Sequence, residues 1–383
     1  MRNILKSAAA AAAAVLLCAC GAKNTSAPEF HYSTAASLEE SATSSAESSA
    51  VSTPESSTDI QASAESTIED AEKPENAARA SLVTSHDPKN RVTISFDGFT
   101  VYVEGRLQQQ VELVCLASEG REKGSVPEYS GEDFSVQFTG SRTIGSFDTL
   151  MIYTETGVRD YRIAVTEDGF LPVDIGANAA DNTAALNLKL TLPEDGVKEY
   201  ISFDLDPQKI AEALSQVQEI SDTVCENITD DYEKLRALAQ WVSDNIYYDY
   251  DARDNDVTPE TLCLSHVLET HRTVCGGFST LFAALCQAQG LECFNIRGRA
   301  LNTGISYAED YGSDAMHEWN YAVIDGRGIW IDTVWNTSNA YKQEEYRPGR
   351  VHSQYFDPTD EAFALDHHAQ ICEYRDFFAV MND

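Results

Sequence analysis

Basic residues are scarce in this sequence, and their scarcity excludes several kinds of partner. The 383 residues include 27 Lys and Arg against 62 Asp and Glu, which gives a formal net charge of -35. Nucleic acids and anionic membrane surfaces are bound by clusters of Lys and Arg. We therefore expect neither a nucleic-acid partner nor electrostatic docking on a membrane. Such an acidic balance is typical of a well-solvated secreted protein.

The usual metal and redox motifs are missing as well. The sequence contains no Cys-x-x-Cys and no His-Glu-x-x-His, which argues against a zinc ribbon, a thioredoxin-type redox site and a zincin site. His367 and His368 are adjacent, but no third ligand follows at a spacing that metal sites use. We predict that the protein needs no metal and no other cofactor.

The apolar run near the N-terminus is short. After a basic start it covers residues 8–17, which is too little to span a bilayer. It leads into LCACG at residues 17–21, which resembles a bacterial lipobox. The resemblance implies a lipoprotein signal peptide at residues 1–20, lipidation of Cys20 and a lipid-anchored location on the extracellular face of a bacterial cell membrane. An ordinary secretory signal with incidental cysteines is the alternative.

Residues 21–89 are rich in Ser, Ala, Thr and Glu and poor in aromatic residues. Such a segment cannot bury enough apolar surface to offset the entropy lost on ordering, so we predict a disordered tether. Beyond it, residues 90–195 contain short β-rich runs separated by turn signals such as Asp97-Gly98. This pattern predicts an all-β, immunoglobulin-like sandwich, either a spacer or a module that binds carbohydrate or peptide. The predicted strands are 92–96, 100–104, 111–117, 134–139, 150–154, 160–165 and 184–192.

From residue 206 the apolar period becomes helical, and it gives way to strands near the end of the chain. Helices come first and antiparallel strands afterwards, which indicates an α+β domain over residues 200–383. We predict helices at 207–224, 231–246, 259–270 and 275–290, and strands at 293–298, 317–324 and 329–335.

Six cysteines remain when Cys18, Cys20 and Cys275 are set aside from the total of nine. In an extracellular protein they could form disulfides. They could equally be free thiols, because Cys is among the most buried residue types. The six are Cys115, Cys225, Cys263, Cys286, Cys293 and Cys372.

Cys275 opens the fourth predicted helix, in the segment VCGGFS. The unpaired amides and the dipole at a helix start favour a thiolate over a thiol. The Cys275 amide is also placed to stabilise an oxyanion. Gly276 and Gly277 are poor helix formers, and we interpret them as allowing substrate close to the backbone. A buried structural thiol is the alternative for any single Cys at such a position.

His317 and Asp332 lie in two strands joined by Asp325-Gly326, a signal for a two-residue hairpin turn. That turn sets Ile324 opposite Arg327. The resulting register places His317 opposite residue 334 and Asp332 diagonally beside it on the same face. A carboxylate there would orient the imidazole, which in turn would accept a thiol proton. A strand histidine satisfied by a surface Asp is the alternative.

Four blocks in residues 233–336 together resemble the transglutaminase-like core, a branch of the papain-like thiol enzymes. They are WVSDNIYYD at 241–249, VCGGFS at 274–279, HEWN at 317–320 and WIDTVW at 330–335. The resemblance implies a papain-like catalytic domain with Cys275 as nucleophile, His317 as general base and acid, and Asp332 as the orienting carboxylate. The tail, with Tyr355, Asp357 and Asp366-His367, also resembles bacterial lipoproteins of this class.

Three aromatic residues are weaker site predictions. Tyr248 matches the family's aromatic residue before the nucleophile helix, where it could assist an oxyanion. Trp319 and Trp335 could line the cleft. Core packing is the alternative for all three. His271 precedes Cys275 closely, but it ends a helix and is expected to face solvent.

The sequence thus predicts a surface cysteine enzyme that transfers an acyl group from a protein or peptide amide through a thioester on Cys275. An amine acceptor would give crosslinking and water would give hydrolysis. The competing hypothesis is a catalytically inactive surface module that binds a peptide or glycan, in which the triad is a relic.

Overall fold

The structure of this chain is a computed structural model that describes residues 79–118, 121–140, 143–255, 257–300 and 316–381. The predicted signal peptide, Cys20 and most of the predicted tether lie outside the described residues. The described chain starts before residue 90, because strand β1 (Ser81–Val83) falls inside the last part of the predicted tether. Within the described residues, no helix combines the length and the apolarity that a membrane crossing requires.

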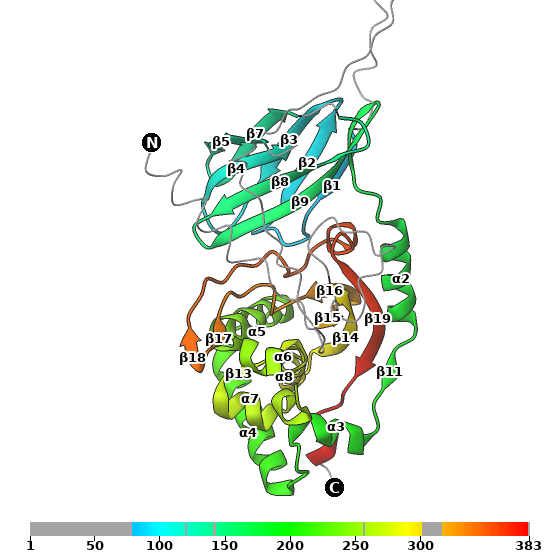
Figure 1. Ribbon diagram of the computed structural model, residues 1–383. Coiled ribbons are helices and arrows are strands. Elements are labelled where there is room, and N and C mark those ends of the chain that lie inside the picture. The colour runs from blue at the N-terminus through cyan, green and yellow to red at the C-terminus, as the bar shows by residue number, and fades with distance from the viewer. Residues whose placement is uncertain (1–78, 119–120, 141–142, 256, 301–315, 382–383) are drawn as a thin grey trace, which may run out of the picture. The chain divides into compact units, whose positions relative to one another are not determined.

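The first part of the described chain is an all-β sandwich (Figure 1), as predicted. Buried residues alternate along the longer strands, such as β2, β7 and β8, and form one apolar core, which includes Ile94, Val103 and Ile152. An immunoglobulin-like topology remains a prediction. One five-stranded sheet has the order β1-β2-β3-β7-β6, with β2 (Val92–Asp97), β3 (Thr100–Gly105), β7 (Asp133–Thr139) and β6 (Glu128–Ser130). The other has the order β10-β9-β8-β4-β5, with β10 (Gly169–Pro172), β9 (Gly157–Thr166), β8 (Phe147–Thr154), β4 (Val111–Ser118) and β5 (Arg121–Ser125).

The predicted strand at 184–192 is wrong. This region forms helix α2 (Gly176–Asn187) and the two-residue strand β11 (Leu190–Thr191). Alternating leucines resemble a strand, but the alanine-rich stretch before them favours a helix. Figure 1 shows α2 alongside strand β19 (His367–Tyr374), with which β11 also pairs in parallel. Helix α2 and strand β11, which lie before the domain boundary predicted at 195, thus contact a strand of the second part of the chain.

The second part is an α+β domain, as predicted. Asp206 and Asp230 cap two of its helices by accepting hydrogen bonds from backbone amides in the first turn. The predicted third helix is interrupted at Cys263, whose backbone is extended and whose thiol donates to the Glu199 carbonyl. The helices are α3 (Glu194–Ile201), α4 (Pro207–Val224), α5 (Asp231–Asn245), α6 (Tyr250–Asn255), the 3₁₀ helix η1 (Pro259–Leu262), α7 (Leu264–Thr270) and α8 (Cys275–Ala288).

Helix α8 packs against a five-stranded sheet and is buried along most of its length. The order of this sheet is β11-β19-β14-β15-β16, with β14 (Glu292–Ala300), β15 (Met316–Ile324) and β16 (Arg327–Ile331). A smaller sheet has the order β13-β12-β17-β18, with β13 (Arg272–Thr273), β12 (Tyr247–Asp249), β17 (Ala340–Lys342) and β18 (Glu345–Arg347). The short helices α9 (Asp360–Phe363) and η3 (Ala379–Met381) complete the described chain.

The predicted hairpin register is confirmed, because Ile324 pairs with Arg327. The second strand, however, ends at Ile331 and does not continue to residue 335. Of the two alternatives for the cysteines, the described residues show free thiols. The seven described cysteines are buried and form no disulfide: Cys115, Cys225, Cys263, Cys275, Cys286, Cys293 and Cys372.

Candidate active site

Cys275 is the first residue of α8, where the predicted nucleophile was expected. The helix follows Val274, and no side chain caps its first turn. Two polar contacts then fix α8 on β15: Ser279 donates to the Trp319 carbonyl, and Asn320 donates to the Ser279 carbonyl, each at 3.0 Å. Buried polar groups of both α8 and β15 therefore hold the first turns of the helix in place.

The two glycines after Cys275 face the protein's own side chains, so their interpretation as an approach path for substrate is not what the structure shows. A Cβ atom added at Gly277 would lie 2.0 Å from Thr273 Oγ1. At Gly276 it would lie 3.1 Å from Leu262 Cδ2 and 3.4 Å from Glu318 Oε2. Gly277 is thus required by the close packing of the segment that precedes α8.

His317 and Asp332 meet in the interior. His317 Nε2 lies 2.7 Å from Asp332 Oδ2, and both side chains are buried. The strand ladder stops at the pair Asn320 and Ile331, so the predicted pairing of His317 with Val334 does not form. A turn after β16 orients the carboxylate instead: Asp332 Oδ1 accepts from the amides of Val334 at 2.9 Å and Trp335 at 3.0 Å.

The carboxyl group of Asp332 is held ionised by its neighbours. Burial alone would raise its pKa. The positive charge and hydrogen bond of His317 outweigh that effect, with a further contribution from His367, and the pKa of Asp332 is lowered. A buried, ionised carboxylate beside an imidazole stabilises the imidazolium form, which is the arrangement that a thiol-activating base requires.

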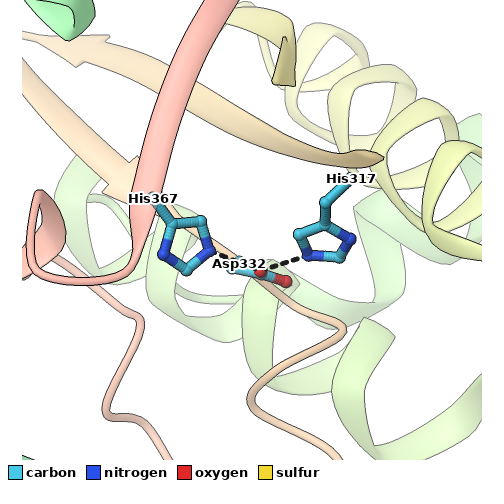
Figure 2. A group of neighbouring side chains, drawn as sticks. All are labelled: His317, Asp332 and His367. Atoms are coloured by element: carbon cyan, nitrogen blue, oxygen red, sulfur yellow. Dashed lines mark hydrogen bonds and ion pairs between the residues drawn. The ribbon is translucent and has the colours of Figure 1, made fainter. Parts of the chain in front are cut away.

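A second histidine, which the sequence did not place in the site, joins this pair. Figure 2 shows His317 and His367 on either side of Asp332. His367 Nε2 lies 3.1 Å from the same Asp332 Oδ2, and its Nδ1 lies 2.5 Å from Asp366 Oδ1. The sequence drew attention to His367 for two reasons only: it is adjacent to His368, and it belongs to the C-terminal tail that resembles bacterial lipoproteins of this class. No local spacing signals its contact with Asp332, because the contact depends on β19 pairing with β14.

The same three side chains are close enough to be considered as metal ligands, since their ligand atoms lie within 4.8 Å of one another. Ligands of a tetrahedral ion with bonds of about 2.1 Å lie about 3.4 Å apart. The 2.7 Å between His317 Nε2 and Asp332 Oδ2 is instead a hydrogen-bond length. Two hydrogen bonds to one carboxylate oxygen therefore account for the cluster.

The other predicted site residues are mainly packing residues. Tyr248 is buried and packs against Tyr250 and against Phe278 of α8. Trp319 is 1% exposed, which is too little to line an open cleft. Trp335 is half-buried, and its ring lies 5.8 Å from that of His317. His271 is exposed at the end of α7, as expected.

Comparison with known proteins finds similarity over the segment that carries Cys275, His317 and Asp332. Residues 218–333 match the model of the transglutaminase-like superfamily. Kyphoscoliosis peptidase of Mus musculus is 24% identical over 123 residues, which are 32% of this chain and 18% of that protein. The Homo sapiens protein of the same name is 25% identical over 125 residues, 33% of this chain and 19% of that protein. The chain thus spans about a fifth of the length of the curated relatives it matches.

Among solved structures, one match is titled a putative cysteine protease from Cytophaga hutchinsonii. It is 14% identical, with a TM-score of 0.25, and the match covers 68% of each chain. A second is titled a TGase, 20% identical with a TM-score of 0.27 over 33% of each chain. The matched segment of the present chain contains Cys275, His317 and Asp332, whereas His367 lies beyond it.

Proposed function

We propose that this chain, whose residues 218–333 form a transglutaminase-like domain, is a cysteine enzyme that acts on protein or peptide amides. The observation that carries the proposal is the buried pair of His317 and Asp332 at 2.7 Å. Gly276, the residue after Cys275, lies against the carboxylate of Glu318, the residue after His317. This contact brings the start of α8 to the start of β15.

The reaction uses the three side chains in succession. His317 Nε2 is engaged with Asp332, so we assign proton exchange with the Cys275 thiol to Nδ1. The thiolate attacks the amide carbon, and the backbone amide at the start of α8 stabilises the oxyanion. The C–N bond then breaks, the amine leaves with the proton held by His317, and a thioester remains on Cys275.

The second half of the reaction sets the product. Water attacks the thioester carbon while His317 accepts its proton. The C–S bond then breaks, the carboxylic acid is released, and the Cys275 sulfur and His317 regain their starting state by sharing that proton. An amine attacking in the same way forms a new amide and completes a crosslink. The lipobox-like residues 17–21 support a lipid-anchored enzyme on the outer face of a bacterial membrane, with proteins or peptides of the cell envelope as substrates.

The nucleophile is tested by alkylation with iodoacetamide, read by peptide mass spectrometry. We expect Cys275 to react faster than Cys286, a fully buried thiol in the same helix. The signal at residue 275 should disappear in Cys275→Ala. Equal, slow labelling of both thiols in the folded protein would contradict the proposal and favour an inactive binding module.

Incubation with peptides, with and without a small primary amine, separates the two outcomes of the thioester. Amine incorporation at glutamine side chains identifies a transferase. Cleavage of the peptide with no incorporation identifies a hydrolase. The catalytic proposal fails if no peptide is cleaved or modified by the amine and if His317→Ala also keeps the biological activity of the protein.

A further inference from the structure

His367 bridges two carboxylates in the interior of the domain. Its side chain is fully buried, and its two ring nitrogens lie 3.1 Å from Asp332 and 2.5 Å from Asp366. Asp366 is bound in turn by the hydroxyl of Tyr355, which donates to its second oxygen at 2.7 Å. An ionised carboxylate only accepts hydrogen bonds, so a ring that bonds two of them carries a proton on both nitrogens.

The charge of this cluster depends on that second proton. When His367 is protonated, its cationic ring offsets one of the two carboxylates, and a protonated His317 offsets the other. Without the cationic rings, two buried negative charges would stand close together, and one of them would take up a proton. Burial would lower the pKa of His367, but the charge of Asp366 and the hydrogen bonds to both carboxylates outweigh it and raise the pKa.

Aromatic rings surround His367 and suit a cation. Phe363 stacks on the His367 ring with ring centroids 4.0 Å apart. Trp335 and Trp319 pack against it in T-shaped geometry, with centroid distances of 4.7 Å and 5.0 Å. The faces of aromatic rings attract positive charge. The ionisable groups that face or influence the cluster are Asp332, His317, Asp366 and Tyr355, together with Arg159 and Asp160 of β9 and His352.

Helix α2 fixes the strand that carries His367. The Asn182 side chain donates to the His367 carbonyl at 3.2 Å and accepts from the Ala369 amide at 2.6 Å. The position of the ring is therefore set by elements on both sides of the segment that matches the family model. Neither His367 nor Asp366 falls within residues 218–333.

We propose that His367 is a positioning residue of the active site, a fixed imidazolium that keeps Asp332 ionised and directed at His317. The proposal rests on the proposed role of Cys275, because positioning Asp332 matters only if His317 activates a thiol. Asp366 and Tyr355 hold the imidazolium from its far side. The C-terminal strand β19 thereby contributes a group to the site beyond the three family residues.

The test is the pH dependence of Cys275 alkylation by iodoacetamide in the full chain. In His367→Gln, the positive charge beside Asp332 is lost, so the Asp332 carboxyl takes up a proton more readily and stabilises the His317 imidazolium less. We expect alkylation at pH 6 to slow by about tenfold and its acid limb to move to higher pH. His368→Gln is the matched control, because His368 is the next residue and binds Asp181 at the surface. A profile of His367→Gln identical to that of His368→Gln would overturn the proposal.

A second measurement does not require a reactive thiol or a well-folded His367 variant. Nitrogen NMR of the wild-type imidazole rings should show both nitrogens of His367 protonated at pH 7. Asp366→Asn, which keeps the shape of the side chain, should lower the pH at which His367 loses its proton. A neutral His367 ring at pH 7 would contradict the proposal directly.

The two proposals fail in different ways. If wild-type Cys275 alkylates no faster than Cys286, the proposed function is wrong whatever His367 does. If wild-type Cys275 is reactive and His367→Gln leaves its pH profile unchanged, only the positioning role is wrong.

Discussion

At the scale of single residues, Asp332 is the centre of the candidate site. One of its oxygens receives hydrogen bonds from two histidines, and the other receives two backbone amides. This saturation explains how a fully buried carboxylate stays ionised.

Asp332→Asn tests this role. The amide keeps the shape of the side chain but cannot stabilise an imidazolium, so we expect alkylation of Cys275 at neutral pH to fall by about a hundredfold. The rate is measured with iodoacetamide in the folded protein, with circular dichroism as the check on folding. Asp181→Asn, at the exposed partner of His368, should leave the rate unchanged. An unaltered rate in Asp332→Asn would show that the carboxylate plays no part.

His352 gives a pH dependence of stability. Burial, and next the charge of Arg159, lower the pKa of His352 to about 3, so the ring is neutral in the folded state. As the pH falls below about 6.5, the unfolded chain binds a proton that the folded chain does not. His352 therefore costs about 1.4 kcal/mol of stability for each pH unit between about 6.5 and the folded pKa.

Urea unfolding between pH 7 and pH 4.5 measures this effect in wild type and in His352→Gln. We expect the loss of unfolding free energy on acidification to be smaller in the variant, whatever its stability at pH 7. His368→Gln serves as the surface control and should follow the wild-type slope. Parallel slopes in all three proteins would mean that His352 does not titrate as its burial implies.

At the scale of elements, the start of α8 depends on one of its two glycines. A side chain at Gly277 would overlap Thr273, whereas one at Gly276 would make tighter than usual contacts with Leu262 and Glu318. We expect Gly277→Ala to destabilise the protein by about 2 kcal/mol, since overpacking outweighs the gain in helix propensity. Gly276→Ala should cost less. Chemical denaturation compares the two, and a larger loss in Gly276→Ala would contradict the packing described.

Local signals predicted most of the elements near the site. Asp206 and Asp230 cap α4 and α5, and the Asp325-Gly326 turn sets the register of β15 and β16. These features depend on residues within a few positions of one another. Where the predictions were wrong, the structure shows contacts between distant segments: α2 packs on β19, and the Cys263 thiol donates to the Glu199 carbonyl where the third helix is interrupted.

At the scale of the whole described chain, a buried ion pair connects the segment before β2 with α5. Asp87 is fully buried, and both of its oxygens bind the Arg236 guanidinium at 2.7 Å and 2.6 Å. Burial would raise the pKa of Asp87, but hydrogen bonds from Arg236 and Asn90 outweigh it and lower the pKa. Lys89 and Glu233 form a second, exposed pair between the same two segments.

The two pairs give a matched comparison. Arg236→Met leaves the Asp87 carboxylate buried without its cation, and we expect a loss of about 3 kcal/mol in the free energy of unfolding. Lys89→Met removes an exposed partner and should change the stability by less than about 1 kcal/mol. Urea unfolding measures both variants. If both variants lower the free energy of unfolding by the same small amount, the buried pair does not stabilise the contact between the two segments.

The sequence by itself predicted the residues of the candidate triad, and it determined the helix start and the hairpin that carry them. The reason is that caps, turns and apolar periods act over a few neighbouring residues, and the pair His317 and Asp332 is only 15 positions apart on one hairpin. Only the tertiary structure decided that His367 joins them, 35 positions beyond Asp332. Pairing of β19 with β14 and packing of α2 bring that ring to Asp332, and no local pattern encodes a contact made by strand pairing across the sheet.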